Sequence, residues 1–310
     1  MKLEFPFIGV DWGTSRMRAM FCEAGRSKLD SANTVSGDGI SKLDCPPAEA
    51  LFEAVAPWVK RTGKLDIVLA GMVGANIGWR TTPYLACPLD LRNLPDAAVS
   101  FAENGHAISI LPGVSCENAF GQPDLMRGEE LQVLGWLSQH PDANSGERLL
   151  CLPGTHTKWV CMRDGRIESF TTSLTGELYA LLYERSVLVP PEDRQALEPF
   201  QADSFLKGVD LASRERASLI HALFSTRSRS IIGDDHSHDP GSYLSGLLIG
   251  SDVGLAKPLL VSDVSGIEII GDEQLADKFA LALRHIGYEC NVSDGIEMVY
   301  AGFIALAAGV

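Results

Sequence analysis

The chain has 310 residues, of which 45% are apolar and 21% are charged, which is enough material for two domains with substantial cores. Its formal net charge of -14 at pH 7 argues against nucleic acid or an anionic membrane as a partner, because both attract clustered lysine and arginine. No apolar run reaches about 18 residues, so we expect no membrane-spanning helix.

Cysteine usage indicates a reducing compartment. The seven cysteines are odd in number, scattered, and never spaced Cys-x-x-Cys, a pattern typical of reduced thiols in a cytoplasmic protein. The first residues enter an apolar strand pattern at once and do not resemble a signal peptide. We therefore expect a cytoplasmic protein. A homodimer is the expected assembly, because two-fold dimers are the commonest oligomers of soluble proteins.

The first half of the chain alternates predicted strands and helices. In chain order these are three strands within 5–35, a helix at 46–61, a strand at 65–70, a loop-rich stretch at 75–90, a strand at 108–111 and a helix at 127–139. The polar segment 140–147 is the best linker candidate, since it gathers Pro, Asp, Asn, Ser and Gly.

The second half repeats this alternation. It is predicted to contain a strand hairpin at 149–162, mostly helix over 175–228, a polar loop at 231–241, a helix at 243–254, strands at 259–261 and 267–270, and helices at 275–286 and 296–308. The alternation predicts the α/β class. With the linker as boundary, we expect two domains, 1–143 and 144–310.

One turn is used twice. Asp11-Trp12-Gly13-Thr14-Ser15 follows an apolar strand near the start, and Leu152-Pro153-Gly154-Thr155-His156 follows another in mid-chain. Glycine lets the backbone approach a phosphate closely, and successive N–H groups with a hydroxyl form an anion cradle. Two such turns, one in each half, suggest that both grip phosphates, as in a kinase-like ATPase. The alternative for each turn is an ordinary hairpin.

The two turns differ in their chemistry. Asp11 ends a buried strand beside the first turn, where a carboxylate can hold Mg²⁺, and Leu152 occupies the equivalent place in the second. Thr155, His156 and Lys158 offer the second turn donors for a phosphate. The alternatives are a structural histidine and a solvated lysine.

An acidic pair opens the helix at 127–139. Glu129 and Glu130 follow Arg127 and Gly128, and a kinase needs a carboxylate to accept the proton of the substrate hydroxyl. The competing interpretation is a helix cap, because acids are favoured at a helix N-terminus. We nominate Glu129 as the base, with Glu130 second.

These motifs together resemble the 2-dehydro-3-deoxygalactonokinase family, a branch of the actin, hexokinase and Hsp70 ATPase superfamily. The most specific matches are Met126-Arg127-Gly128-Glu129-Glu130 and Pro153-Gly154-Thr155-His156-Thr157-Lys158-Trp159. Further matches are Gly9 to Ser15, Ala70 to Gly74 with Gly78-Trp79 and Pro83-Tyr84, Leu223-Phe224-Ser225 with Arg227, and Tyr243 to Gly250.

The resemblance implies ATP-dependent phosphorylation of 2-dehydro-3-deoxy-D-galactonate at O6, in galactonate breakdown. It implies two actin-like (ribonuclease H-like) ATPase domains with ATP and Mg²⁺ in the cleft, the sugar-acid site in the first domain and the nucleotide site in the second. Gly13, Thr14, Ser15 and the Gly154 turn would flank the phosphates. The adenosine would lie near Gly271.

The acid substrate needs a cation or a cluster of N–H donors for its carboxylate. The loop after the strand at 65–70 is the expected place, since α/β folds bind ligands at the carboxyl ends of strands. We nominate Asn76, Trp79, Arg80 and Arg127, with packing as the alternative for Trp79. Two other functions stay open: a kinase for another sugar or sugar acid, and a non-catalytic nucleotide-dependent switch.

Overall fold

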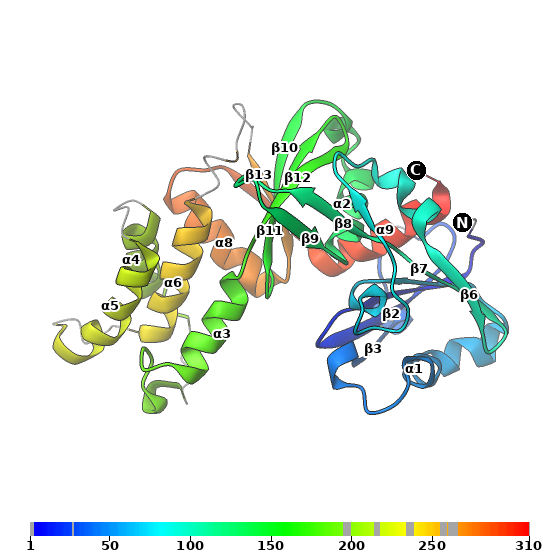
Figure 1. Cartoon of the computed structure of the whole chain (residues 1–310), viewed down its shortest axis with the longest axis horizontal. Helices are drawn as coiled ribbons and strands as arrows, with labels where there is room; N and C mark the ends of the chain where they lie inside the picture. The colour runs from blue at the N-terminus through cyan, green and yellow to red at the C-terminus, as the bar shows by residue number, and fades with distance from the viewer. Residues whose placement is uncertain are drawn as a thin grey trace. The chain divides into compact units, whose positions relative to one another are not determined.

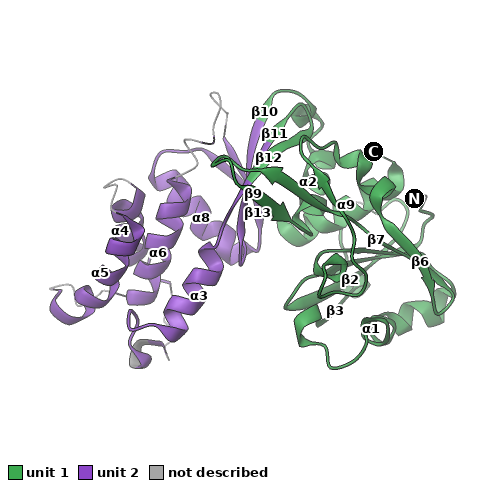
Figure 2. Cartoon of the chain, viewed as in Figure 1, with its two compact units in different colours: residues 1–147, 162–170, 293–310 green, residues 148–161, 171–292 purple. Residues whose placement is uncertain are grey.

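The computed structural model describes residues 3–26, 28–194, 200–213, 218–233, 239–254, 259 and 266–309. Contacts between Cα atoms divide the chain into two compact units (Figure 2). Unit 1 comprises Met1–Glu147, Met162–Phe170 and Ser293–Val310, and unit 2 comprises Arg148–Cys161 and Thr171–Val292. The chain first leaves unit 1 close to the predicted boundary. However, the units are not the contiguous 1–143 and 144–310, because two later segments return to unit 1.

Unit 1 is built on a six-stranded mixed sheet in the order β3-β2-β1-β4-β7-β6 (Figure 1). Its strands are β1 (Phe7–Trp12), β2 (Arg16–Cys22), β3 (Thr34–Asp38), β4 (Ile67–Ala70), β6 (Val99–Glu103) and β7 (His106–Ile110). β1, β4 and β7 run parallel, while β2, β3 and β6 pair antiparallel with their neighbours. The carboxyl ends of β1 and β4 therefore meet at one edge, where α/β folds bind ligands.

Helices cover both faces of this sheet. They are α1 (Pro47–Thr62), α2 (Glu129–Gln139) and α9 (Gly295–Ala308). Val55 and Trp58 of α1 join Val10 of β1 in one core cluster. The Phe303 ring of α9 lies against the backbone of Gly9. Because successive strand residues point to opposite faces, α1 and α9 lie on opposite sides of the sheet.

The C-terminal helix belongs to unit 1 because it packs closely on α2. A Cβ atom at Gly135 would lie only 1.8 Å from the Met298 carbonyl oxygen, and one at Gly302 would lie 2.3 Å from the Leu131 carbonyl oxygen. Glycine at both contact points lets the two helix backbones approach each other. The sequence gives no direct signal of this long-range pairing.

Unit 2 holds a five-stranded sheet in the order β12-β11-β10-β13-β14 with helices around it. Its elements are β10 (Glu147–Leu152), β11 (Thr157–Arg163), β12 (Arg166–Ser173), β13 (Ile267–Gly271), β14 (Cys290–Asp294), α3 (Thr175–Arg185), α4 (Ala202–Ser213), α5 (Leu219–Ile232), α6 (Pro240–Val253) and α8 (Glu273–His285). α6 is buried along almost its whole length and packs against α3, α4, α5 and α8. The tip of the β11–β12 hairpin counts with unit 1, where Phe170 N–H donates to the Cys116 sulfur at 3.3 Å.

The predicted α/β alternation is confirmed, and so are the long helices, which correspond to α1, α2, α6, α8 and α9. A small sheet was not predicted. It consists of β5 (Tyr84–Ala86), β8 (Gly113–Glu117) and β9 (Pro123–Met126), and β5 lies inside the expected loop at 75–90. The strand expected at 259–261 falls mostly outside the described residues, and Leu259 itself is helical. Of the loop expected at 231–241, residues 234–238 are also outside them, while α5 extends to Ile232 and α6 begins at Pro240.

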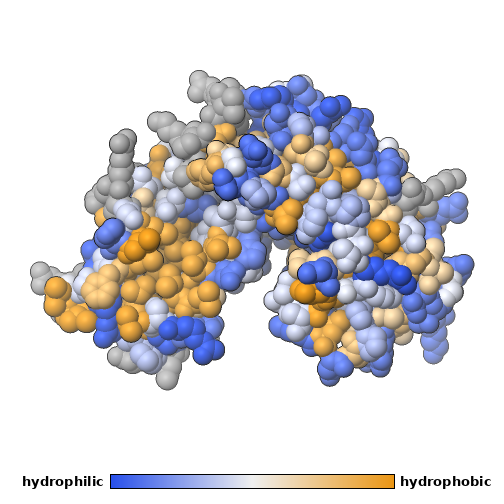
Figure 3. All heavy atoms as spheres, viewed as in Figure 1, coloured by the Kyte–Doolittle hydropathy of each residue, from blue (hydrophilic) through white to orange (hydrophobic). Residues whose placement is uncertain are grey.

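Large apolar side chains reach the surface mainly in unit 2 (Figure 3). Leu181 of α3 is 51% exposed, and Ile220, Phe224 and Ile231 of α5 are 81%, 60% and 62% exposed. The three α5 residues lie at helical spacing on one face. None of the helices in the described parts of the chain combines the length and apolarity that a membrane crossing requires.

Candidate functional site

The first turn, between β1 and β2, keeps its donors available. Gly13 N–H closes the hairpin by donating to the Arg16 carbonyl at 2.9 Å, and the following segment takes up the turn's carbonyls: Ile40 N–H donates to Gly13 and Ser41 N–H to Thr14, both at 3.1 Å. Within the described residues, no hydrogen bond uses the N–H or hydroxyl donors of Thr14 and Ser15. The turn can therefore offer two N–H groups and two hydroxyls to a phosphate.

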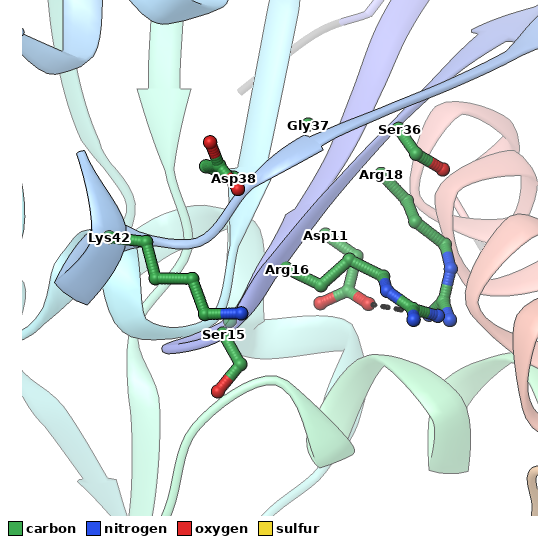
Figure 4. A pocket seen from close by; sticks show the side chains of 9 residues that line it. Asp11, Ser15, Arg16, Arg18, Ser36, Gly37, Asp38 and Lys42 are labelled. Carbon is green, nitrogen blue, oxygen red and sulfur yellow. Dashed lines mark ion pairs between the residues drawn. The ribbon is translucent and has the colours of Figure 1, made fainter. Parts of the chain in front are cut away.

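A pocket of about 670 Å³ lies beside this turn (Figure 4). It is lined by Asp11, Gly13, Ser15, Arg16, Arg18, Ser36, Gly37, Asp38 and Lys42. The lining combines three cations with two carboxylates. Asp11, Gly13 and Ser15 of this set were predicted from the sequence, whereas Ser36 and Asp38 of β3 and Lys42 just after it were missed because this polar stretch carries no motif.

Asp11 sits where a carboxylate is costly to ionise. Its side chain is 26% exposed, and the Arg18 guanidinium lies 3.9 Å from Oδ2. Loss of hydration raises the pKa of Asp11 to about 6; Arg18 lowers this pKa and the nearby Glu129 charge raises it. Asp11 and Glu129 are therefore electrostatic neighbours, although 118 positions separate them in the sequence.

Three backbone segments make this proximity possible. A Cβ atom at Gly71, directly after β4, would lie 2.8 Å from the Trp12 carbonyl oxygen at the end of β1. A Cβ atom at Gly128 would lie 3.4 Å from the Gly71 Cα. Both glycines have positive φ, 95° and 112°, which favours glycine. The junction of Trp12, Gly71 and Gly128 thus brings the end of β1 and the start of α2 together, and with them Asp11 and Glu129.

The two acids of α2 have different environments. Glu129 is partly exposed, and its Oε2 accepts the Arg127 N–H at 3.0 Å. Glu130 is fully buried; its Oε2 accepts the Gly128 N–H at 2.7 Å, and its Oε1 has no partner among the described residues. Burial, with the Glu129 charge second, raises the pKa of Glu130 to about 8. Of the two acids, Glu129 is therefore the one with an accessible carboxylate.

The cations and the tryptophan nominated for the substrate are engaged in packing. Arg127 is buried, donates to the Thr82 hydroxyl and carbonyl, and lies 4.3 Å from the centre of the Tyr84 ring. Trp79 packs edge-on against Phe101, with 5.1 Å between the ring centres. The Arg80 guanidinium carbon lies 4.1 Å from the centre of the same Phe101 ring.

Asn76 differs from these three residues. It is exposed and makes no side-chain hydrogen bond within the described residues. Of the four nominated residues, Asn76 alone is thus unengaged, and the structure does not bring it into the pocket lining.

Magnesium chemistry fits the acids of this unit. Among the described residues, no group of three or more His, Cys, Asp or Glu side chains gathers to enclose a metal ion. Mg²⁺ is commonly held by only one or two carboxylates, with phosphate oxygens and waters completing the octahedron. Asp11 alone, or with Glu129 nearby, satisfies that requirement.

The second turn, in unit 2, is shaped by the start of α3. Glu177 N–H donates to the Thr155 carbonyl at 2.9 Å, and a Cβ atom at Gly176 would lie 2.3 Å from the Gly154 carbonyl oxygen. His156 Nε2 lies 2.6 Å from the Glu177 carboxylate, and both side chains are 45% exposed. Thr155 is exposed, so the turn presents Thr155 and His156 to solvent.

Lys158 points elsewhere. Its side chain is buried and its ammonium donates to the Thr172 hydroxyl of β12 at 2.8 Å. Behind the turn, the buried Asp252 of α6 accepts Trp159 Nε1 at 2.8 Å and the Thr175 hydroxyl. Asp252 thereby fixes the first residue of α3 against β11. The sequence analysis missed Asp252, because a single aspartate in a helix carries no signal.

A second pocket, of about 270 Å³, adjoins the second turn. Gly154, Thr155, Thr175 and Gly176 form its polar end, and Leu248, Ile249, Leu275 and Phe279 are among its apolar walls. Lys278 also lines the pocket, and burial lowers its pKa. Gly271 lies next to the turn, since a Cβ atom there would be 3.4 Å from the Pro153 carbonyl oxygen, but it does not line the pocket.

The buried Glu130 should make stability depend on pH. The folded protein keeps its proton up to about pH 8, whereas an unfolded chain releases it near 4.5. Between these values the native state binds one more proton, so the free energy of unfolding falls as pH rises, by at most about 1.4 kcal/mol per pH unit. Glu130→Gln should remove this contribution. In urea titrations from pH 5 to 8, the wild type should lose stability relative to Glu130→Gln.

The matched control for the loss of one glutamate is Glu53→Gln, on the exposed face of α1. A stability difference between the wild type and Glu130→Gln that stays constant from pH 5 to 8 would contradict the buried, protonated state.

Comparisons with known proteins identify the family of the chain. The family model described as 2-keto-3-deoxy-galactonokinase matches residues 11–306. The chain is 30% identical over 308 residues to the 2-dehydro-3-deoxygalactonokinase of Escherichia coli K12, and the match covers 98% of each chain.

Solved structures show the same fold. A crystal structure described as "a putative 2-dehydro-3-deoxygalactonokinase protein from Sinorhizobium meliloti" superimposes with a TM-score of 0.84 at 29% identity, covering 97% of this chain and 98% of that one. An ADPNP-bound activator of 2-hydroxyisocaproyl-CoA dehydratase from Clostridium difficile, 11% identical over 98% of this chain and 96% of that chain, shares the fold alone, with a TM-score of 0.51. The expected α/β fold of actin-like ATPases and sugar kinases is confirmed. The chain belongs to the 2-keto-3-deoxy-galactonokinase family.

Proposed function

We propose that this protein transfers the γ-phosphoryl group of ATP to the O6 hydroxyl of 2-dehydro-3-deoxy-D-galactonate, a step of galactonate breakdown. Membership of the family supports this substrate class. The observation that carries the proposal is the backbone junction of Trp12, Gly71 and Gly128, which brings Asp11 in β1 near Glu129 at the start of α2, beside a turn whose phosphate donors are available. Phosphoryl transfer needs those three parts: a metal-binding carboxylate, a base and phosphate donors.

Glu129 is proposed as the catalytic base. Its carboxylate accepts the Arg127 N–H and is partly exposed, so we propose that it accepts the proton of an acceptor hydroxyl as that oxygen attacks phosphorus. Asp11 would hold Mg²⁺, which when bound supplies positive charge to the phosphate oxygens. Gly13, Thr14 and Ser15 would donate N–H and hydroxyl hydrogen bonds to phosphate.

In unit 2, Gly154, Thr155 and His156 are proposed to contact the phosphates of the nucleotide. The 270 Å³ pocket beside them, apolar with one lysine, suits an adenosine group, with Gly271 close to its entrance turn. We propose that Lys158 is a positioning residue, because its ammonium donates a hydrogen bond to the Thr172 hydroxyl.

In unit 1, Asn76, Trp79 and Arg80 are kept as proposed acceptor contacts from the loop after β4. Arg127 is proposed to position α2 through Thr82 and Tyr84 and to contact the acceptor only secondarily. No disulfide joins the seven cysteines, which supports a cytoplasmic location. The homodimer stays a prediction.

A coupled ADP-release assay over a panel of sugar acids and neutral sugars tests the function. We expect the highest kcat/KM on 2-dehydro-3-deoxy-D-galactonate, with ADP and phosphorylated sugar formed in equal amounts. Preference for another sugar acid would support kinase activity but would contradict the proposed substrate. No turnover on any acceptor, with ATP still bound, would favour the nucleotide-dependent switch.

The base assignment predicts a clear difference between neighbours. Glu129→Gln should lower kcat by about 10²- to 10⁴-fold, because a positioned general base contributes that much, while ATP binding measured by calorimetry is retained. Glu130→Gln should keep a kcat near that of the wild type, because the native Glu130 is already protonated at neutral pH. The reverse pattern would make Glu130 the base, and full activity in both variants would leave the pair as a helix cap.

Asp11→Asn tests the metal assignment. Removing the carboxylate charge should weaken Mg²⁺ binding, so activity should require a much higher Mg²⁺ concentration, with partial recovery at saturation. The measurement is a Mg²⁺ titration of kcat at fixed ATP. An unchanged midpoint would place the metal elsewhere.

A further inference from the structure

The pocket beside the first turn carries more positive charge than the turn itself provides. Arg16, Arg18 and Lys42 line it together with Asp11 and Asp38. The lining therefore has a net formal charge of +1. That charge suits a further anionic group beside the phosphate turn, such as the carboxylate of a monoanionic acceptor.

The three cations differ in whether they are engaged. Arg18 is paired with Asp11. The side chains of Arg16 and Lys42 form no ion pair or hydrogen bond with any residue that the structure describes. In the view of Figure 4, the two guanidinium groups lie on one side of the Asp11 carboxylate and the Lys42 ammonium lies on the other, near Ser15.

The position of Lys42 is fixed by the turn. It ends a short 3₁₀ helix, Ile40–Lys42, whose N–H groups at Ile40 and Ser41 donate to the carbonyls of Gly13 and Thr14. The Ser41 hydroxyl donates to the same Thr14 carbonyl at 2.9 Å. Three hydrogen bonds therefore hold the backbone before Lys42 against the turn. A long cationic side chain on a fixed backbone, without a protein partner, is suited to binding an anionic group of a ligand.

We propose that Lys42 binds the carboxylate of the acceptor and so selects sugar acids over neutral sugars. Ser36 and Asp38, on the same pocket wall, supply hydrogen-bond partners for the hydroxyls of its carbon chain. The acceptor carboxylate then lies at Lys42 and its terminal hydroxyl toward Asp11 and Glu129. This assignment rests on the proposed function, and it replaces Arg80 and Arg127 as the carboxylate contact, since both of those guanidinium groups are occupied.

The test combines a change in the protein with a change in the substrate. Wild type and Lys42→Met are assayed with 2-dehydro-3-deoxy-D-galactonate and with its uncharged C1 carboxamide. Lys42→Met should lower kcat/KM for the acid about 10- to 100-fold, the range for loss of a charge-assisted hydrogen bond, mainly through KM. The carboxamide and the KM for ATP should change less than about twofold, because neither involves the lost ion pair. Lys42→Arg should retain most of the preference for the acid.

Lys64→Met is the matched control, since Lys64 is an exposed lysine between α1 and β4 that does not line the pocket. It should leave both acceptors unaffected. Equal losses for acid and carboxamide in Lys42→Met would overturn the assignment and indicate a structural role. A raised KM for ATP alone would assign Lys42 to the nucleotide. A wild type that prefers the carboxamide would overturn both proposals, whereas an acid preference that survives in Lys42→Met overturns only the Lys42 assignment.

Discussion

The close approach of three backbones at Trp12, Gly71 and Gly128 is the constraint on which the candidate site depends. β1 and β4 end at the same edge of the sheet because they are parallel neighbours. The turn from β9 into α2 can reach that edge only if no side chain intervenes, and the two glycines meet this condition. Any Cβ atom at Gly71 would push the end of β1 away and separate Asp11 from Glu129. The chemistry of unit 1 is thus set by packing between main chains.

The acids around this junction differ in how deeply they are buried. Glu130, the most buried acid, is neutral at pH 7 and caps the start of α2 through Gly128. Asp11 is intermediate, with a pKa raised to about 6, so a bound cation would favour its ionised form. Glu129 is the acid of the helix pair that stays accessible. One helix start therefore holds one structural and one accessible carboxylate, and burial is the main cause of the difference.

Sequence reasoning could nominate the parts of the candidate site that lie in contiguous motifs. Asp11 and the Gly13–Ser15 turn, Glu129, and the second turn are local patterns, and the α/β class follows from the alternation of strands and helices. The surroundings of residues that contact distant parts of the sequence were predicted less well. Arg127 looked available but is held by Thr82 and by Tyr84, and Tyr84 begins a strand of an unpredicted small sheet. Lys158 faces β12, a direction that depends on strand pairing.

The missed residues have a common cause. Asp38 becomes a pocket residue only when β3 pairs with β2, and Lys42 only when the segment after β3 bonds to the first turn. Lys278 lines the second pocket only when α8 packs near the second turn. The return of α9 to unit 1 depends on Gly135 and Gly302 meeting across more than 160 residues of sequence. None of these contacts leaves a periodic or motif signal in a single sequence.

The account places the acceptor carboxylate at one end of the pocket and the reacting hydroxyl at the other, toward Glu129. It therefore requires phosphorylation at the carbon farthest from the carboxylate. A two-dimensional proton–phosphorus correlation spectrum of the product formed by the wild type measures this directly. The account predicts a single phosphomonoester whose phosphorus couples to the two protons of the C6 methylene. Coupling to a single methine proton, or the absence of any phosphomonoester, would contradict it.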